Sequence, residues 1–251
     1  MLQTVQKIGP LLDLFTPDRP EWGVSEAAEA LGVPRSSAHA LMTSLVEIGL
    51  LSTTGRGRYR LGWRIIELYQ VLQSGLDLRE AAAPILARLN EETGETVNLA
   101  VLDRGNVLYL DKVAARQQVS VQGLRVGTRL EPHATALGKA LLAALTPADA
   151  AKLLGPGPLR KYTQNTVTDP NVLLAQLEDV RRTGLATEEN ELVLDVSCVA
   201  SPIRDSYGSI VAAISVSVPS HRLRARRKEI TQAVRSAANE ISQRVAEASE
   251  R

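Results

Sequence analysis

Apolar residues near the N-terminus recur at helical spacing, and the pattern breaks where short turns are expected. Residues 24–50 contain two amphipathic segments separated by residues 32–34. Ser25 is placed to cap the first segment, Gly32 to end it in the left-handed conformation, and Pro34 to fit the first turn of the second. The pattern therefore predicts two short helices joined by a tight turn.

The second of these helices has an apolar side and, from its N-terminal end, a polar side. The polar side consists of Arg35, Ser36, Ser37, His39 and Thr43. Such a face on the second helix of a pair is typical of a helix that lies in the major groove of DNA. Helix pairs with this turn also occur in many all-α domains, so the pair alone leaves a purely structural role open.

A basic hairpin is predicted directly after the helix pair. Residues 50–61 read as two short strands around a glycine-containing turn. Arg56, Arg58 and Arg60 fall in this segment, and no acidic residue lies between residues 49 and 66. Charged hairpins are usually just solvated, but one that follows a helix-turn-helix is typical of a wing whose arginines contact phosphates or the minor groove. The combination favours DNA binding.

Apolar periodicity continues along the rest of the chain and alternates between helical and strand spacing. Helices are expected over residues 4–15 (with a kink or a new start at Pro10), 62–74, 77–93, 134–145, 147–154, 169–182 and from 220 nearly to the end. Strands are expected over residues 96–102, 107–113, 118–122, 196–203 and 210–218. This order of helices and antiparallel strands indicates an α+β fold. Residues 62–75 are interpreted as a linker helix and a candidate dimer seam.

Composition restricts the function classes without choosing among them. The chain has 251 residues, enough for one large or two smaller domains, and its net charge of +1 means that basic character is local. The single cysteine, Cys198, excludes an intramolecular disulfide and fits a reducing cytoplasm. No apolar stretch approaches a membrane span of about 18 residues, and the N-terminus does not read as a secretory signal. One cysteine and three scattered histidines have no zinc spacing, so no metal or cofactor is expected.

Two segments of the C-terminal part carry a resemblance to a known family. Residues 129–140 contain Pro-His-Ala-Thr-Ala-Leu-Gly-Lys-Ala, and residues 188–202 end in Cys-Val-Ala-Ser-Pro. Together with the winged helix, they resemble the IclR family of bacterial transcription regulators over the whole chain. The resemblance implies a winged helix-turn-helix (1–61), a linker helix (62–75) and a GAF-like effector-binding domain with an antiparallel sheet (76–251). It also implies a small organic effector and a homodimer or dimer of dimers.

The resemblance implies an effector site as well. In the family, backbone N–H groups at the start of the helix after the histidine hold a ligand carboxylate, and these match Ala136 and Leu137; free N–H groups and the helix dipole favour an anion. The other matching positions are Glu188, Val196, Cys198, Ser215 and Ser217. The two serines alternate along a strand and can face one cavity. The alternative is that the cysteine is a small buried hydrophobe and that the serines satisfy neighbouring backbone.

Some positions depart from the family pattern or allow a second interpretation. Glu188, Asn190 and Asp195 stand where an aspartate, a second acid and a glycine are usual, so an effector cannot be borrowed from a relative. For His133 we favour a structural role, as a cap or turn residue, over ligand contact. For Lys139 we favour a tether to a loop or to a dimer partner over attraction of an anion.

The favoured function is a ligand-responsive transcription regulator, with repression favoured, that binds a palindromic operator as a dimer in the bacterial cytoplasm and controls a metabolic operon. The first alternative is an enzyme with Cys198 or Ser215 as nucleophile. It would need a base within hydrogen-bond reach, and no nucleophile elbow, Walker loop or HExxH motif occurs, so no catalytic residue is assigned. The second alternative is a winged helix that binds protein; it would show an acidic or apolar recognition face.

Overall fold

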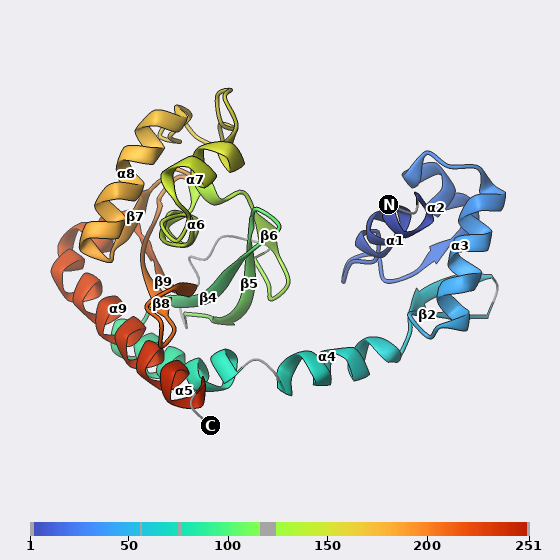
Figure 1. Cartoon of the computed structure of the whole chain (residues 1–251), viewed down its shortest axis with the longest axis horizontal. Helices are drawn as coiled ribbons and strands as arrows, with labels where there is room; N and C mark the ends of the chain where they lie inside the picture. The colour runs from blue at the N-terminus through green and yellow to red at the C-terminus, as the bar shows by residue number, and fades with distance from the viewer. Residues whose placement is uncertain (1–2, 56, 75–76, 116–123, 250–251) are drawn as a thin grey trace. The chain divides into compact units, whose positions relative to one another are not determined.

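The computed structural model describes residues 3–55, 57–74, 77–115 and 124–249. The chain divides into two compact units, Met1–Leu76 and Asp77–Arg251, and each is described by itself (Figure 1). The strand expected over residues 118–122 and the side chain of Arg56 lie outside the described residues.

The N-terminal unit is a winged helix-turn-helix. Its elements are α1 (Gln3–Asp13), β1 (Trp22–Gly23), α2 (Val24–Leu31), α3 (Arg35–Glu47), β2 (Leu51–Thr54), β3 (Arg58–Leu61) and α4 (Arg64–Ser74). The three strands are antiparallel in the order β1-β3-β2, so the predicted wing is extended by a short strand that precedes α2. Leu11, Trp22, Ala27, Met42 and Leu45 are buried together and form the core of the unit.

The helix-turn-helix matches its prediction at the turn and differs at the helix starts. Gly32 ends α2 in the left-handed conformation, with φ 63°, as predicted. The prediction that Ser25 is the N-cap is wrong: α2 begins at Val24, and Gly23 is its N-cap. The N–H of Gly23 donates to the carboxylate of Glu26 over 2.8 Å, which replaces a hydroxyl cap. Pro34 is the N-cap of α3 rather than part of its first turn.

The C-terminal unit is built on a six-stranded antiparallel sheet with the order β6-β5-β4-β9-β8-β7. Its helices are α5 (Asp77–Thr93), a 3-10 turn (Pro132–Ala134), α6 (Ala136–Leu142), α7 (Pro147–Leu154), α8 (Pro170–Thr183) and α9 (Ser220–Ser249). Its strands are β4 (Thr96–Asp103), β5 (Asn106–Val113), β6 (Arg129–Leu130), β7 (Ala186–Glu189), β8 (Val196–Arg204) and β9 (Ile210–Pro219). The α+β fold expected from the sequence is confirmed, although β6 and β7 were not predicted.

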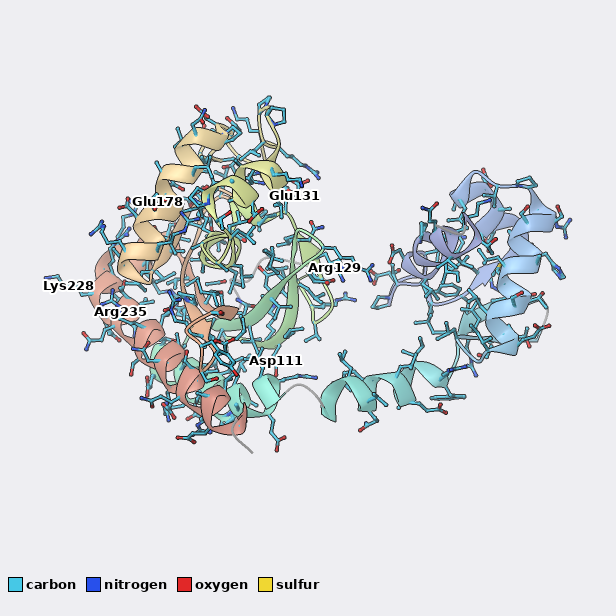
Figure 2. The ribbon with its side chains drawn as sticks, viewed as in Figure 1. Asp111, Arg129, Glu131, Glu178, Lys228 and Arg235 are labelled. Atoms are coloured by element: carbon cyan, nitrogen blue, oxygen red, sulfur yellow. The ribbon has the colours of Figure 1, made fainter. Side chains whose placement is uncertain are left out.

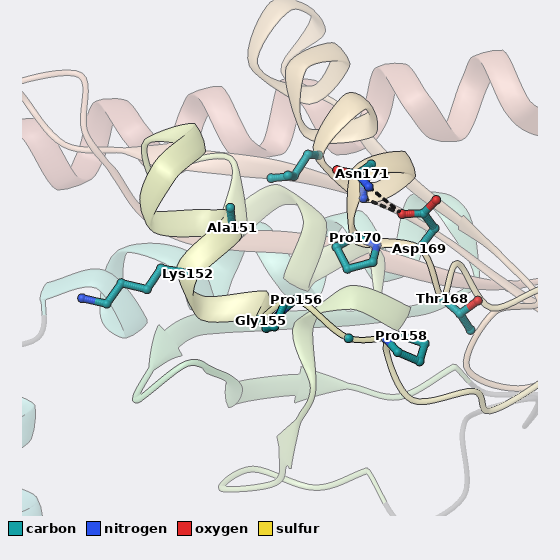
Figure 3. Close-up of a pocket in the computed structure, with 11 residues that line it drawn as sticks. Ala151, Lys152, Gly155, Pro156, Pro158, Thr168, Asp169, Pro170 and Asn171 are labelled. Atoms are coloured by element: carbon teal, nitrogen blue, oxygen red, sulfur yellow. Dashed lines mark hydrogen bonds between the residues drawn. The ribbon is translucent and has the colours of Figure 1, made fainter.

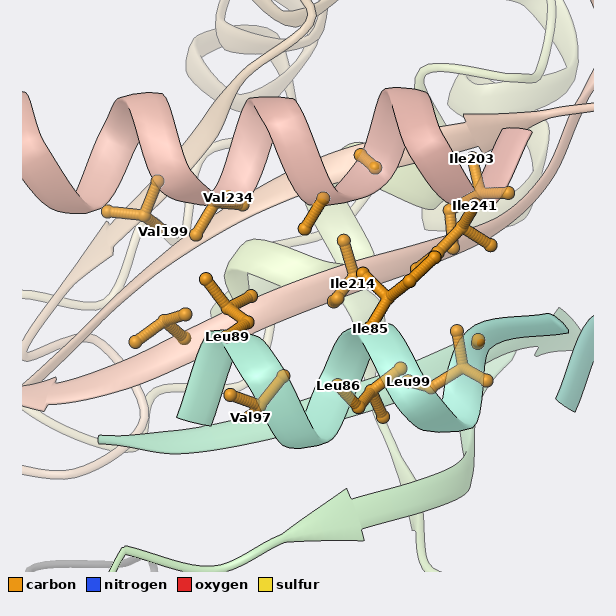
Figure 4. Close-up of a cluster of buried hydrophobic side chains, with 14 of the residues drawn as sticks. Ile85, Leu86, Leu89, Val97, Leu99, Val199, Ile203, Ile214, Val234 and Ile241 are labelled. Carbon is orange, nitrogen blue, oxygen red and sulfur yellow. The ribbon is translucent and has the colours of Figure 1, made fainter. Parts of the chain in front are cut away.

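The sheet is covered on both faces. On one face, α5 and α9 pack against the strands through a core that includes Ile85, Leu89, Val97, Ile214 and Val234 (Figure 4). On the other face lies α6, with α7 and α8 packed beyond it (Figure 1). Charged side chains of α8 and α9 point away from this core, as Figure 2 shows for Glu178, Lys228 and Arg235. Polar residues on the α6 face of the sheet are therefore enclosed between two layers.

The single helix expected over residues 134–145 is wrong in its N-terminal part. Thr135 is extended, with φ −128° and ψ 143°, and separates the 3-10 turn from α6. Its hydroxyl accepts a hydrogen bond from the N–H of Gly138 over 2.9 Å and so caps α6. Gly138 is in turn required by packing, because a Cβ there would lie 2.0 Å from the carbonyl oxygen of Pro132. The cap and the close approach together place the start of α6 at Ala136.

None of the described helices is long and apolar enough to cross a membrane. Among the described residues, no group of three or more His, Cys, Asp or Glu side chains is arranged to hold a metal ion.

Candidate functional site

The predicted recognition face of α3 is exposed as a continuous polar surface. Arg35, Ser36, Ser37 and His39 are exposed and Thr43 is half-buried, whereas Ala38, Leu41, Met42 and Leu45 are buried on the other side of the helix. The division between polar and apolar residues predicted from the sequence is confirmed. The exposed residues of this face are accessible to a partner.

The wing arginines differ in what they contact. Arg60 is exposed, and its guanidinium donates to the hydroxyl of Ser52 over 3.3 Å. Arg58 is half-exposed and already has partners: it pairs with Glu26 at 3.3 Å and Glu21 at 3.6 Å and donates to the carbonyl oxygen of Glu21 at 3.0 Å. Its charge is already paired, so this geometry argues against the phosphate contact predicted for Arg58 and supports one for Arg60.

The pKa of the Glu26 carboxyl reflects the same arrangement. The hydrogen bond from the N–H of Gly23 holds this pKa below its usual value, and the nearby charges of Arg58 and Arg19 lower it further. Glu26 therefore serves both as the cap of α2 and as an anchor for β3.

In the C-terminal unit, strand pairing brings polar residues from four strands to the α6 face of the sheet. Cys198 lies opposite Glu188 in the β7–β8 pair and opposite Ser217 in the β8–β9 pair. Asn98 lies opposite Ser215 in the β4–β9 pair. Directly opposed residues point to the same face of a sheet, and so do residues two apart on one strand, such as Ser215 and Ser217. These five side chains therefore share one face and form a polar row, two residue pairs wide, across β7, β8, β9 and β4.

The row is joined by hydrogen bonds. The amide of Asn98 donates to the hydroxyl of Ser217 over 3.2 Å and reaches that of Ser215 at 3.5 Å. The thiol of Cys198 donates to Ser217 over 3.3 Å. The carboxylate of Glu188 accepts hydrogen bonds from the backbone N–H groups of Glu191 and Leu192 in the loop after β7.

A small cavity lies on this row, at the N-terminal end of α6. All seven positions implied by the family resemblance line it: Ala136, Leu137, Glu188, Val196, Cys198, Ser215 and Ser217. Among the described residues, Tyr109, Leu124, Thr135, Leu192 and Val193 also line it. Its volume is about 10 Å³, room for about one water molecule. The residues are thus brought together, but a larger molecule requires part of the lining to move.

Burial raises the pKa of two groups that line the cavity, the Glu188 carboxyl and the Cys198 thiol. It raises the pKa of the Glu188 carboxyl to about 7, against the opposing effect of the two N–H groups that bind it. Burial also raises the pKa of the Cys198 thiol well above its ordinary value, and the nearby charge of Glu188 adds to that effect. A neutral thiol is a poor nucleophile, so the environment of Cys198 argues against the enzymatic alternative.

Asn98 is a member of the row that the sequence pattern did not predict. Its side chain is buried, and its Oδ1 atom has no hydrogen-bond partner among the described residues. A buried amide oxygen without a partner is costly and is therefore rare unless a bound group uses it. The sequence signal was a polar residue inside the apolar run of residues 97–102.

His133 and Lys139 have structural contacts, as favoured from the sequence. The Nε2 atom of His133 lies 2.8 Å from the carbonyl oxygen of Arg160, and its ring packs 5.8 Å from that of Tyr162. Lys139 pairs with Glu191, both buried, and so tethers the loop between β7 and β8 to α6. Neither residue lines the cavity.

A larger hollow lies elsewhere in the unit, between α7 and α8 (Figure 3). It has a volume of about 850 Å³ and is bordered by the Gly-Pro-Gly-Pro segment, residues 155–158. Asp169 faces it but already caps α8 by accepting from the N–H of Asn171 over 2.8 Å. None of the predicted effector positions borders this hollow.

Comparison with known proteins finds relatives over the whole chain. The IclR helix-turn-helix domain family matches residues 4–55, and the bacterial transcriptional regulator IclR C-terminal family matches residues 70–243. The chain is 30% identical to the HTH-type transcriptional regulator XynR of Escherichia coli (strain K12) over 224 residues, covering 89% of this chain and 88% of XynR. It is 31% identical to the transcriptional repressor IclR of the same organism over 216 residues, covering 85% and 78%.

A solved structure is similar in fold over the same extent. The crystal structure of an IclR homologue from Microbacterium hydrocarbonoxydans, complexed with 4-hydroxybenzoate, matches with a TM-score of 0.85 and 30% identity. The match covers 97% of this chain and 99% of that one.

Proposed function

Because the chain belongs to the IclR family of DNA-binding transcriptional regulators, which are not enzymes, we propose that it represses a metabolic operon in response to a small organic acid. The observation that supports this most is the cavity beside α6. Residues from α6, β7, β8 and β9 that are far apart in the sequence line one cavity. We assign residues 1–61 to DNA binding, 62–75 to the linker and 76–251 to effector binding.

In the proposed DNA complex, α3 enters the major groove. Arg35, Ser36, Ser37 and His39 contact base edges, because they form the exposed N-terminal face of the helix. Thr43 and the wing residues Arg56 and Arg60 contact the DNA backbone. A homodimer, or a dimer of dimers, presents two such helices to a palindromic operator in the bacterial cytoplasm, with half-sites about one or more helical turns apart.

The proposed effector carries a carboxylate. The first N–H groups of a helix have no partner within the helix, and α6 begins with Ala136 and Leu137 at the cavity. The hydroxyls of Ser215 and Ser217 and the amide of Asn98 add polar contacts. A structural relative holds 4-hydroxybenzoate, which is a compound of this class.

Effector binding is proposed to change DNA binding by shifting a conformational equilibrium. The cavity has a volume of only about 10 Å³, so an organic acid fits only a form with a wider cavity. A ligand that binds only the wider form shifts the population toward it. The helix α4, which belongs to the segment between the two binding regions, transmits the shift.

The test is fluorescence anisotropy of the full-length protein on DNA from upstream of its own coding region, with random DNA as the reference. Small organic acids are added in turn, and the response is compared for the wild type, Arg35→Ala and the double variant Ser215→Ala/Ser217→Ala. We expect specific binding that one class of acid changes, loss of site preference in the first variant, and loss of the acid response alone in the second. The proposal would be refuted if the wild type bound its upstream DNA no more tightly than random DNA and a genome-wide selection also yielded no fragment that it prefers.

A further inference from the structure

The polar row across the sheet continues to a fifth strand. Lys112 on β5 lies directly opposite Asn98 on β4. The pairing shifts between Leu99 and Ala100, so that Ala100 lies opposite Tyr109 and Leu110 is skipped. Because of this bulge, Tyr109 and Lys112 point to the same face although they are three residues apart. Since Tyr109 lines the cavity, Lys112 lies on the cavity side of the sheet.

The ammonium group of Lys112 has a neutral partner only. It donates to the carbonyl oxygen of Leu124 over 2.8 Å, and no carboxylate of the described chain pairs with it. Its side chain is half-buried, and burial lowers the pKa of Lys112 from its ordinary value. A partly desolvated cation without a counter-charge is unfavourable in the free protein and is available to an anion.

Leu124 links this cation to the cavity. It lines the cavity, and its carbonyl oxygen is the acceptor for Lys112. The cavity has room for about one water molecule, so a larger molecule must displace part of the lining. If Leu124 is displaced, Lys112 loses its acceptor at the moment when a ligand arrives. Asn98 lies directly opposite Lys112, and its Oδ1 has no partner among the described residues, so it is an acceptor available to the ammonium group. The amide nitrogen of Asn98 already reaches the two serines.

We propose that Lys112, which lies directly opposite Asn98, is a second anion-binding group of the effector site, so that the effector is a small dicarboxylic acid. The inference rests on the proposed function. One carboxylate lies at the start of α6 with Ser215 and Ser217, and the other pairs with the ammonium of Lys112 two strands away. Neighbouring strands lie about 4.8 Å apart, so the two groups belong to a compact molecule. A monocarboxylate leaves Lys112 without its counter-charge.

The test is calorimetric titration of the full-length protein with matched pairs of acids: butyrate with succinate, pentanoate with glutarate, and hexanoate with adipate. We expect at least one dicarboxylate to bind about tenfold or more tightly than its partner. In Lys112→Met this preference should disappear, and in Lys112→Arg part of it should remain. The control is Lys152→Met, which removes an exposed lysine at the hollow of Figure 3 and should leave the preference unchanged.

Folding of each variant is checked by circular dichroism, and Lys112→Gln replaces the methionine variant if that one does not fold. The inference is overturned if the preference for a dicarboxylate persists in the variant without the Lys112 charge. It is also overturned if each monocarboxylate binds the wild type as tightly as its matched dicarboxylate, or if no dicarboxylate binds. Any of these results leaves the regulator proposal intact as long as another compound changes DNA binding. If the wild-type protein bound no DNA specifically, the proposed function itself would be refuted.

Discussion

Lys139 of α6 and Glu191 of the loop after β7 form an ion pair in the interior, with side chains 2% and 9% exposed. The backbone carbonyl of Glu191 also accepts hydrogen bonds from the hydroxyls of Thr163 and Thr166. Glu191 therefore connects its own loop both to α6 and to the loop that contains Thr163 and Thr166. It immediately precedes Leu192, which lines the cavity. The ion pair therefore holds the loop that contributes Leu192 to the cavity lining against α6.

We expect Lys139→Met to destabilise the C-terminal unit by about 3–5 kcal/mol, because it leaves the buried carboxylate of Glu191 without a partner. The double variant Lys139→Met/Glu191→Leu should recover most of the loss. Urea unfolding followed by far-UV circular dichroism measures the effect, while both tryptophans, Trp22 and Trp63, report on the N-terminal unit by fluorescence. A double variant as unstable as the single one would contradict this account.

The control for the buried pair is an exposed one in the same unit. Arg182 pairs with Asp179 on α8 at 2.8 Å, and both side chains are at least 70% exposed. Arg182→Met should cost less than about 1 kcal/mol, because exposed ion pairs are screened by water.

Gly138→Ala should destabilise the same unit by about 1–3 kcal/mol. The added Cβ would lie 2.0 Å from the carbonyl oxygen of Pro132, a backbone atom that cannot move without disrupting the 3-10 turn. Gly157→Ala is the matched control, since nothing lies within 4 Å of its Cβ and its effect should stay within about 0.5 kcal/mol. Equal stability of the two variants would show that the start of α6 adapts to a side chain.

How far the fold could be predicted depended on local signals. Asp169 and Gly184 bound α8 as expected, because a side-chain cap and a left-handed glycine act within one turn. The segment Ala186–Glu189 was missed because two of its four residues are glutamates, and β6 was missed because it has two residues. Thr135 was read as helical because its extended conformation depends on the contact between Gly138 and Pro132.

The candidate site was predictable only where a family pattern existed. Motif positions such as Ala136, Glu188 and Cys198 came from the resemblance, and they meet in one cavity. Asn98 and Lys112 belong to no motif, and their placement depends on a strand register that includes a bulge. Arg58 was assigned to DNA from its charge, whereas its partners Glu21 and Glu26 lie more than 30 residues away in the sequence.

The stability of the C-terminal unit should fall as the pH rises through the range in which Glu188 ionises. The carboxyl has its ordinary pKa of 4.5 in the unfolded chain and a pKa of about 7 in the folded one. Between these values the folded state binds more protons, so the free energy of unfolding decreases with pH and levels off above about pH 7. A shift of this size corresponds to about 3 kcal/mol.

Glu188→Gln removes this dependence, because the amide stays neutral while its oxygen can still accept from Glu191 and Leu192. Relative to wild type, the variant should gain about 3 kcal/mol of stability between pH 4.5 and pH 8, as measured by urea unfolding at several pH values. Glu189→Gln, which removes an exposed charge one residue further along β7, should lack this gain. A pH-independent difference between Glu188→Gln and wild type would show that the Glu188 carboxyl is not desolvated.

Substitutions of the two wing arginines, Arg58 and Arg60, should have different effects: one on the stability of the N-terminal unit and the other on DNA binding. Arg60→Ala removes an exposed guanidinium and should lower the salt dependence of binding by about one counterion on any DNA sequence. Arg58→Ala breaks the half-exposed pairs with Glu21 and Glu26; it should lower the stability of the N-terminal unit by about 1 kcal/mol and leave the salt dependence unchanged. Anisotropy at several salt concentrations measures the first effect, and tryptophan fluorescence during unfolding measures the second. If Arg58→Ala lowered the salt dependence as much as Arg60→Ala, its ion pairs would have to open when DNA binds.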